Sequence, residues 1–182
     1  MTMVTLEQGL LLQACQELIS SDAKSELNPA FIIKAILSGN AWALGWKYPS
    51  YGIVRDADVP PAVIEVARIV EVWSNVQGYF NQLPLVQKAW VAEQAKLSDV
   101  VVVFPGFDRL TESQHLNIAK FMIHDLNRFS EFRYLNLDAH RPMLPEYRRM
   151  RAVYEQAFTK EQPHHLSADA LVIILRSRFL NA

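Results

Sequence analysis

The sequence predicts an all-α, multihelical bundle-like protein with little or no sheet. Apolar residues recur every three to four positions in several separate stretches, which is the spacing of one buried helix face. Prolines and potential capping side chains stand at the beginnings of these stretches and between them. Together the stretches indicate six or seven helices. We expect them to form two packed helical subdomains, residues 1–103 and 104–182, within one compact unit.

The composition favours a cytoplasmic protein. The 182 residues carry 18 basic and 19 acidic side chains, for a formal net charge of −1, and this balance disfavours a dedicated nucleic-acid protein. The single cysteine, Cys15, excludes an intramolecular disulfide. The N-terminus lacks the pattern of a signal peptide. No apolar run approaches the ~20 residues that span a bilayer, so we expect no membrane contact.

The N-terminal region predicts two helices and an aromatic loop. Thr5 and Gln8 fit a capping box that opens the first helix. Pro29 suits the first turn of the second helix, which can end in a left-handed cap at Gly39–Asn40. The loop that follows, residues 41–60, has no clear regular structure and holds Trp42, Trp46, Tyr48 and Tyr51. We expect these rings to pack against helices or a second subunit, and stacking on a ligand is the alternative.

The longest predicted helix begins at Pro60–Pro61. Its apolar face comprises Val63, Val66, Ile69, Val70, Trp73, Val76 and Phe80. Ile64, Val72 and Tyr79 fall outside this face, and we expect them to form a second apolar surface that serves as a subunit contact. Pro84 ends the helix, and a shorter one follows from Leu85 to Leu97. The four valines at 100–103 fit a buried extended segment, for which no partner strand is apparent.

The stretch from Phe104 to Asp108 separates the two halves of the chain. Its Pro-Gly pair kinks the backbone between two phenylalanines, which we expect to lie in apolar surroundings. Thr111 and Gln114 then fit a capping box for a helix that reaches about Phe129.

Two more helices complete the predicted fold. Pro145 suits the first turn of one, whose apolar face comprises Tyr147, Met150, Val153, Tyr154, Ala157 and Phe158. Ser167 is a candidate N-cap for the last helix, which ends near Phe179.

Several short blocks of the chain form one recognisable pattern. The most specific block is the motif Phe104, Gly106, Phe107 and Asp108, followed by Glu112. Further blocks are Lys120–Met122, Pro142–Pro145 with Tyr147, Arg148 and Met150, and His165–Ala168. These blocks resemble the YfbU family of bacterial proteins, and the N-terminal half matches more loosely. The resemblance implies an all-α, self-associating cytosolic protein and supplies no catalytic residues. Between Ala41 and Leu97 this chain is longer than is usual in the family.

Asp108, Glu112 and His115 lie close together around the start of the central helix. His115 falls on the apolar side of that helix, where a neighbouring carboxylate could hold its ring as a general base. An unmarked hydrolase is therefore one alternative function. The competing interpretation makes His115 a core residue and Asp108 a loop-closing or capping residue. The sequence patterns of the best-marked enzyme classes are absent, so no catalytic residue is assigned.

No metal or cofactor site is expected. His124–Asp125 is a pair found in metal-dependent phosphohydrolases, but His115 projects from the opposite side of the same helix. His164–His165 and the loop pair Asp56 and Asp58 lack further ligands at metal-binding spacing.

The only concentrated basic stretch contains four arginines, Arg141, Arg148, Arg149 and Arg151. With Tyr147 among them and Tyr154 three residues after the last, they could hold phosphates and stack on bases, so a nucleic-acid-binding regulator is a second alternative. Because both tyrosines belong to the apolar face, a solvated surface or the rim of a subunit interface is favoured. The sequence therefore favours a non-enzymatic interaction or regulatory protein that works as a homo-oligomer, with an additional protein partner left open.

Overall fold

The computed structural model describes residues 15, 16, 27–51, 59–160 and 166–179. The described residues contain seven α-helices and no sheet, with a single isolated bridge between Phe107 and Asp138. The all-α prediction is confirmed. Of the first predicted helix, which begins near Thr5, only Cys15 and Gln16 are among the described residues, and both are helical. None of the described helices is long and apolar enough to cross a bilayer.

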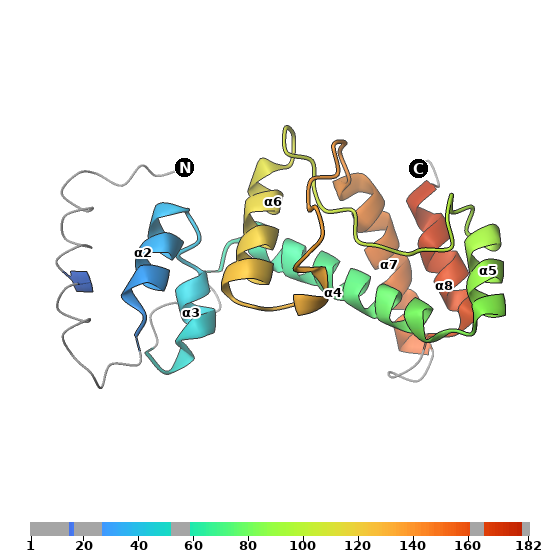
Figure 1. The fold of residues 1–182 in the computed structure, drawn as a ribbon, viewed down its shortest axis with the longest axis horizontal. Helices are drawn as coiled ribbons and strands as arrows, with labels where there is room; N and C mark the ends of the chain where they lie inside the picture. The colour runs from blue at the N-terminus through green and yellow to red at the C-terminus, as the bar shows by residue number, and fades with distance from the viewer. Residues whose placement is uncertain (1–14, 17–26, 52–58, 161–165, 180–182) are drawn as a thin grey trace.

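Helix α4 is the axis of the molecule. It runs along the long dimension, with α2 and α3 at one end and α5 at the other (Figure 1). Three later helices, α6, α7 and α8, contact α4, and α5 and α7 both contact α8. The helices are α2 (Pro29–Leu37), α3 (Ala43–Lys47), α4 (Pro61–Gln82), α5 (Leu85–Gln94), α6 (Ser113–Lys120), α7 (Leu144–Lys160) and α8 (Ala168–Arg176).

Helix α2 begins and ends as its sequence predicts. The Asn28 side chain accepts a hydrogen bond from the Phe31 backbone N–H at 3.0 Å, and Pro29 fills the first turn. Gly39 follows the helix with a φ of 75°, the left-handed conformation that glycine adopts without a steric cost.

The aromatic loop folds into α3 and the short helix η1 (Pro49–Tyr51). Trp42 and Tyr48 are buried, and the indole N–H of Trp42 donates to the Asn40 side chain. The ring centroid of Trp42 lies 6.1 Å from that of Phe121, and the ring centroid of Phe31 lies 5.6 Å from that of Phe121. These rings are therefore part of the packed core.

Helix α4 buries more of its circumference than a single stripe. The predicted apolar residues from Val63 to Phe80 are buried, but so is Val72, which is only 5% exposed. The prediction that Val72 belongs to an exposed second surface is therefore wrong. The physical reason is that α6, α7 and α8 all contact α4. Ile64 remains 49% exposed and Tyr79 is half-buried.

The central helix differs from its prediction at both ends. It begins at Ser113, and no side chain caps it, because the Thr111 backbone N–H donates to Asp108 at 2.9 Å. Regular α-helix stops at Lys120 and passes into a π-helical turn, η3 (Phe121–Asp125). Asn127 and Phe129 then adopt left-handed conformations, which end the helical path.

The last two helices begin close to their predicted starts. Helix α7 begins at Leu144, so that Pro145 lies in its first turn. Ser167 caps α8 by accepting a hydrogen bond from the Ala170 backbone N–H at 3.1 Å. A short helix, η5 (Ser177–Phe179), follows α8 and packs on α7.

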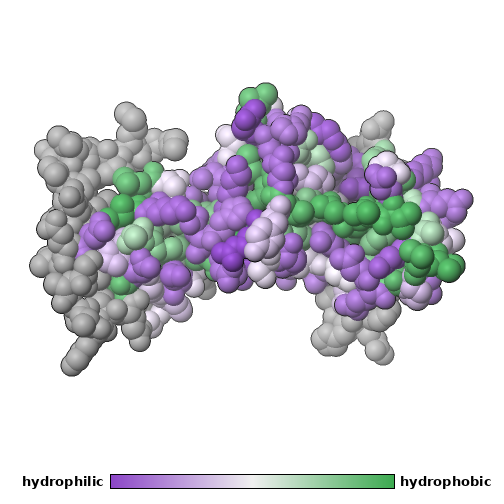
Figure 2. Space-filling view, in the orientation of Figure 1, coloured by the Kyte–Doolittle hydropathy of each residue, from purple (hydrophilic) through white to green (hydrophobic). Residues whose placement is uncertain are grey.

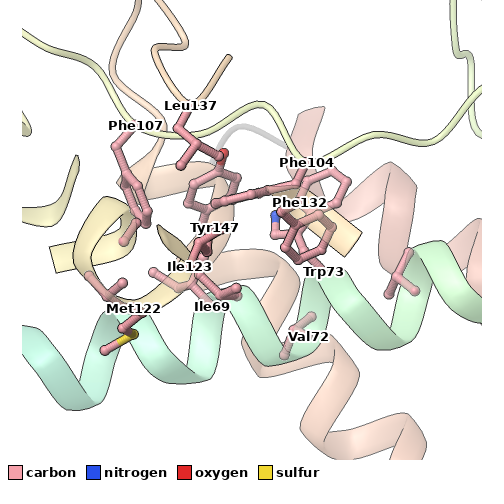
Figure 3. Close-up of a cluster of buried hydrophobic side chains, with 14 of the residues drawn as sticks. Ile69, Val72, Trp73, Phe104, Phe107, Met122, Ile123, Phe132, Leu137 and Tyr147 are labelled. Atoms are coloured by element: carbon pink, nitrogen blue, oxygen red, sulfur yellow. The ribbon is translucent and has the colours of Figure 1, made fainter. Parts of the chain in front are cut away.

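A cluster of aromatic rings forms the centre of the core between α4, α7 and the chain that enters α6 (Figure 3). Phe104 lies within 5.3–5.9 Å of four other rings, those of Trp73, Phe107, Phe132 and Tyr147. Burial raises the pKa of Tyr147, whose hydroxyl donates to the Gly106 carbonyl. The cluster therefore fixes the position of the Phe104–Asp108 motif.

Gly106 lets two distant stretches of backbone touch. Its φ is 85°, and a Cβ atom at this position would lie 1.9 Å from the Leu137 carbonyl oxygen. On the next residue, the Phe107 N–H donates to that same oxygen at 2.8 Å, and Phe107 accepts from the Ala139 N–H at 3.2 Å. Any side chain at position 106 would push the backbone around Gly106 and the backbone around Leu137 apart.

We predict that Gly106→Ala lowers the free energy of unfolding by at least about 4 kcal/mol or prevents folding, because it adds a backbone clash to an unfavourable φ. Gly78→Ala is the matched control, since Gly78 lies in α4 with open space around it, and we expect a gain of about 0.5–1 kcal/mol. Urea denaturation followed by circular dichroism measures both. A Gly106→Ala protein as stable as wild type would contradict this packing.

Candidate functional site

The candidate residues lie where the Phe104–Asp108 motif turns into α6. Asp108 and Glu112 are both buried, at 4% exposure each, and His115 is half-buried. Asp108 precedes α6, Glu112 is its N-cap residue, and His115 lies in its first turn. Their side chains engage three different sets of partners.

The Glu112 carboxylate binds backbone N–H groups from two separate segments. One oxygen accepts from Met143 and Leu144, both at 2.7 Å, and the other accepts from Asp108 at 3.0 Å. Leu144 is the first residue of α7, so the negative charge sits at the positive end of that helix. Glu112 therefore joins the start of α6 to the start of α7.

The Asp108 carboxylate closes its own turn. It accepts from the Thr111 backbone N–H at 2.9 Å and from the Thr111 hydroxyl at 2.5 Å. The hydroxyl hydrogen bond from Thr111 is the main reason that the pKa of Asp108 lies below its usual value. This arrangement replaces the predicted capping box of Thr111 and Gln114.

His115 points to α4 instead of to either of these carboxylates. Its Nε2 lies 3.1 Å from Glu65 Oε2, and its ring lies 5.8 Å from the Phe107 ring. Glu65 also accepts from Arg148 on α7, whose Nε lies 2.8 Å from Oε1. Glu65 thus links α4, α6 and α7 through one carboxylate, and Arg148 is the main cause that lowers its pKa.

Sequence patterns did not single out Glu65 as a site residue. It is 50 residues from His115 and 83 from Arg148 along the chain, so no local spacing connects it with either partner. Asp138 was missed in the same way. It accepts from the backbone N–H groups of Arg109 and His140, at 3.3 and 3.1 Å, beside the motif.

Each of the four arginines engages a partner within the chain. Arg141 pairs with Glu146, Arg148 with Glu65, and Arg151 with Glu155 one turn further along α7. Arg149 donates to the carbonyl oxygens of Ser177 and Arg178, where it closes the end of the C-terminal helices. Their charges are therefore largely matched by neighbouring acceptors.

Metal-ligating groups do not converge in the described part of the chain. No three His, Cys, Asp or Glu side chains gather there closely enough to hold an ion. Asp125 forms an ion pair with Lys34 of α2, while its neighbour His124 is exposed. The pairs Asp56 with Asp58 and His164 with His165 lie outside the described residues.

We predict that Glu112→Gln destabilises the fold by about 3 kcal/mol, because it removes charge-assisted hydrogen bonds and turns an amide donor toward a backbone N–H. Glu155→Gln on α7 is the matched control and should cost less than about 1 kcal/mol, since its pairing with Arg151 is exposed. Equal stability losses in chemical denaturation would show that Glu112 does not organise this junction.

We predict an acid-sensitive contribution from Glu65. Because its pKa in the folded protein lies below its ordinary value of 4.5, its stabilisation is fully present above about pH 4.5 and is lost as pH falls through the lower, folded value. The stability difference between wild type and Glu65→Gln, about 1 kcal/mol at pH 7, should therefore shrink as the pH falls below 4.5 and vanish below the folded pKa of Glu65. Glu71→Gln, whose pairing with Arg68 is exposed, should show a smaller pH dependence. Thermal denaturation across this pH range measures the differences.

The residues of this junction fall within a known protein family. No curated protein and no solved structure matches the chain. The family model for the YfbU domain matches residues 64–177, which include Glu65, the Phe104–Asp108 motif and all of α6 and α7. This span is more than half of the 182 residues. The resemblance seen in the motif is thus confirmed, and the chain belongs to the YfbU family.

Proposed function

We propose that this protein is a non-enzymatic interaction or regulatory protein of the bacterial cytoplasm, and that it works as a homo-oligomer. The observation that carries the proposal is the distribution of its side chains. Most of the large apolar side chains that are exposed among the described residues gather at one end of the molecule, whereas Asp108, Glu112 and His115 are engaged in holding the fold together.

The apolar end consists of exposed side chains on α5, on the linker between α5 and α6, on α8 and on η5. Figure 2 shows an apolar band that follows the linker across this end of the molecule. Several side chains are more than half exposed, which is unusual for large apolar groups in a protein that works alone. The members are Leu85, Val86, Trp90, Val100, Val101, Val103, Ile173 and Phe179.

The three candidate side chains, Asp108, Glu112 and His115, support the same proposal. Asp108 binds Thr111, Glu112 binds three backbone N–H groups, and His115 binds Glu65. A general base needs a free lone pair directed at a space that a substrate can enter. These three side chains face three different partners, which favours a structural role over a hydrolytic one.

We predict that the wild-type protein sediments as a species larger than the monomer between about 1 and about 100 µM. Because the apolar end contributes mainly hydrophobic contact, the assembly should persist at about 0.5 M NaCl, where exposed ion pairs are screened. Sedimentation velocity measures both properties. A monomer at every concentration would refute the oligomer part of the proposal.

A further inference from the structure

Arg128, which follows the π-helical turn η3, carries a charge without a counter-charge. Its side chain is exposed, and its guanidinium forms neither a hydrogen bond nor an ion pair with any residue that the structure describes. The four arginines of the basic stretch, by contrast, are each bound to an acceptor within the chain. The N–H groups of this guanidinium are therefore available to a ligand.

Two aromatic rings hold the guanidinium in place. Its Cζ lies 4.6 Å from the ring centroid of Trp46 on α3 and 5.9 Å from that of Phe129. The ring of Trp46 in turn lies 5.0 Å from the buried ring of Trp42, at an interplanar angle of 74°, so that it is anchored on the core. Contact of this kind orients a guanidinium while its N–H edge stays open to an acceptor.

The backbone around Arg128 has an unusual conformation. The Arg128 N–H donates to the Met122 carbonyl at 2.9 Å, across the π-helical turn. Its neighbours Asn127 and Phe129 have φ values of 55° and 53°, in the left-handed region that a bulky side chain such as phenylalanine rarely adopts. Turns and strain of this kind often occur where they position a functional group. Here they position Arg128.

The indole N–H of Trp46 is a second unpaired donor at the same place. It makes no hydrogen bond with the described residues and, unlike the indole N–H of Trp73, it is not buried. Because it belongs to the ring over which the guanidinium of Arg128 lies, the two donors are close together. The pair therefore forms a small cluster of donors with no acceptor from the described chain.

Positive charge dominates this end of the described chain. Residues 27–51 contain two lysines and no acidic side chain. Lys34 is paired with Asp125 of η3, whereas the ammonium of Lys47 lies over an aromatic ring and has no carboxylate partner among the described residues. Lys47 and Arg128 are thus two cations without a counter-charge, in a chain whose formal net charge is −1. Their field favours an anion at this junction.

We propose that Arg128 and Trp46 bind the phosphate group of a small phosphorylated molecule. The guanidinium fork donates to two phosphate oxygens, and the indole N–H donates to a third. A carboxylate has only two oxygens, both of which the fork engages, so a phosphate satisfies the donors more completely. A nucleic-acid strand needs a longer track of basic groups than this pair supplies. The site is at the α3 end of the molecule, away from α5, and does not depend on self-association (Figure 1).

Isothermal titration calorimetry with inorganic phosphate at low salt tests the site. We expect the wild type to bind with a dissociation constant below about 5 mM, and Arg128→Gln to raise this constant at least about tenfold. Arg133→Gln is the matched control, because it removes the same charge from a nearby exposed arginine, and it should change the constant less than about twofold. An equal loss in the two variants, or no binding by the wild type at about 10 mM phosphate, would overturn the proposal.

Two further variants separate a built site from a general attraction between charges. Arg128→Lys keeps the charge but loses the fork, and we expect the dissociation constant to rise at least about fivefold. Trp46→Phe keeps a ring and removes the indole donor, which should weaken binding about threefold. Trp90→Phe on α5 is the control and should bind as the wild type does. Wild-type affinity in Arg128→Lys would show that the geometry is not used. Circular dichroism melts check that every variant is folded.

Titrations with other anions identify the source of the phosphate. Adenosine monophosphate should bind at least as tightly as inorganic phosphate, and acetate should bind more weakly. Acetate binding as tight as phosphate binding would overturn the assignment to phosphate. A single-stranded oligonucleotide that binds more than about a hundredfold tighter, and loses this affinity in Arg128→Gln, would replace the small molecule with a nucleic acid. A monomeric wild type that binds phosphate would refute the proposed oligomer and leave this site standing.

Discussion

The Glu112 carboxylate is the interaction on which the central part of this fold depends. It is buried and binds backbone N–H groups from two segments that are more than 30 residues apart. A buried charge is costly unless its hydrogen bonds are satisfied, and here three donors satisfy it. Because two of the donors begin α7, the carboxylate sets where that helix starts. It thereby places Tyr147 one turn later, where its hydroxyl reaches the Gly106 carbonyl.

This junction explains why the motif combines aromatic, glycine and acidic residues. The rings of Phe104 and Phe107 supply the apolar contact, and Gly106 allows the backbone at Leu137 to approach. The carboxylates then bind the backbone groups that the kinked chain would otherwise leave unpaired. The residue types of Asp108, Glu112 and His115 suggested a catalytic site in the sequence. In the structure the same side chains connect helices. Ionisable groups at a structural junction and at an active site have similar sequence patterns, and only the direction of their hydrogen bonds separates them.

Features that depend on residues close together in the sequence could be predicted, and features that depend on residues far apart in the sequence could not. Pro29 and Ser167 were predicted as helix starts because the signals that begin a helix act within about four residues, whereas the cap at Asn28 was not predicted. The capping box at Thr111 was wrong because Asp108, three residues earlier, competes for the same N–H. Glu65 and Val72 could not be assigned correctly, since their partners come from helices far along the chain. The family motif was recognisable, whereas the hydrogen bonds that each member makes were not.

The linker between α5 and α6 shows the same limit on what local sequence can predict. Four consecutive valines have a strong preference for extended backbone, and residues 101–106 form neither helix nor turn, although the chain bends at Ser98, Asp99 and Val100. The prediction that this segment is buried is wrong for three of its valines, since Val100, Val101 and Val103 are 45%, 61% and 40% exposed. This preference is not satisfied within the described part of the chain, because residues 98–105 make no backbone hydrogen bond to other described backbone groups and Val101 and Val103 are exposed to water. Soluble proteins usually protect such an edge with charge, proline or a covering element. Here Asp99 and Pro105 border the run but do not interrupt it. Exposed apolar residues with a strong preference for extended backbone favour aggregation, so these valines carry a cost that the fold of the single chain does not offset.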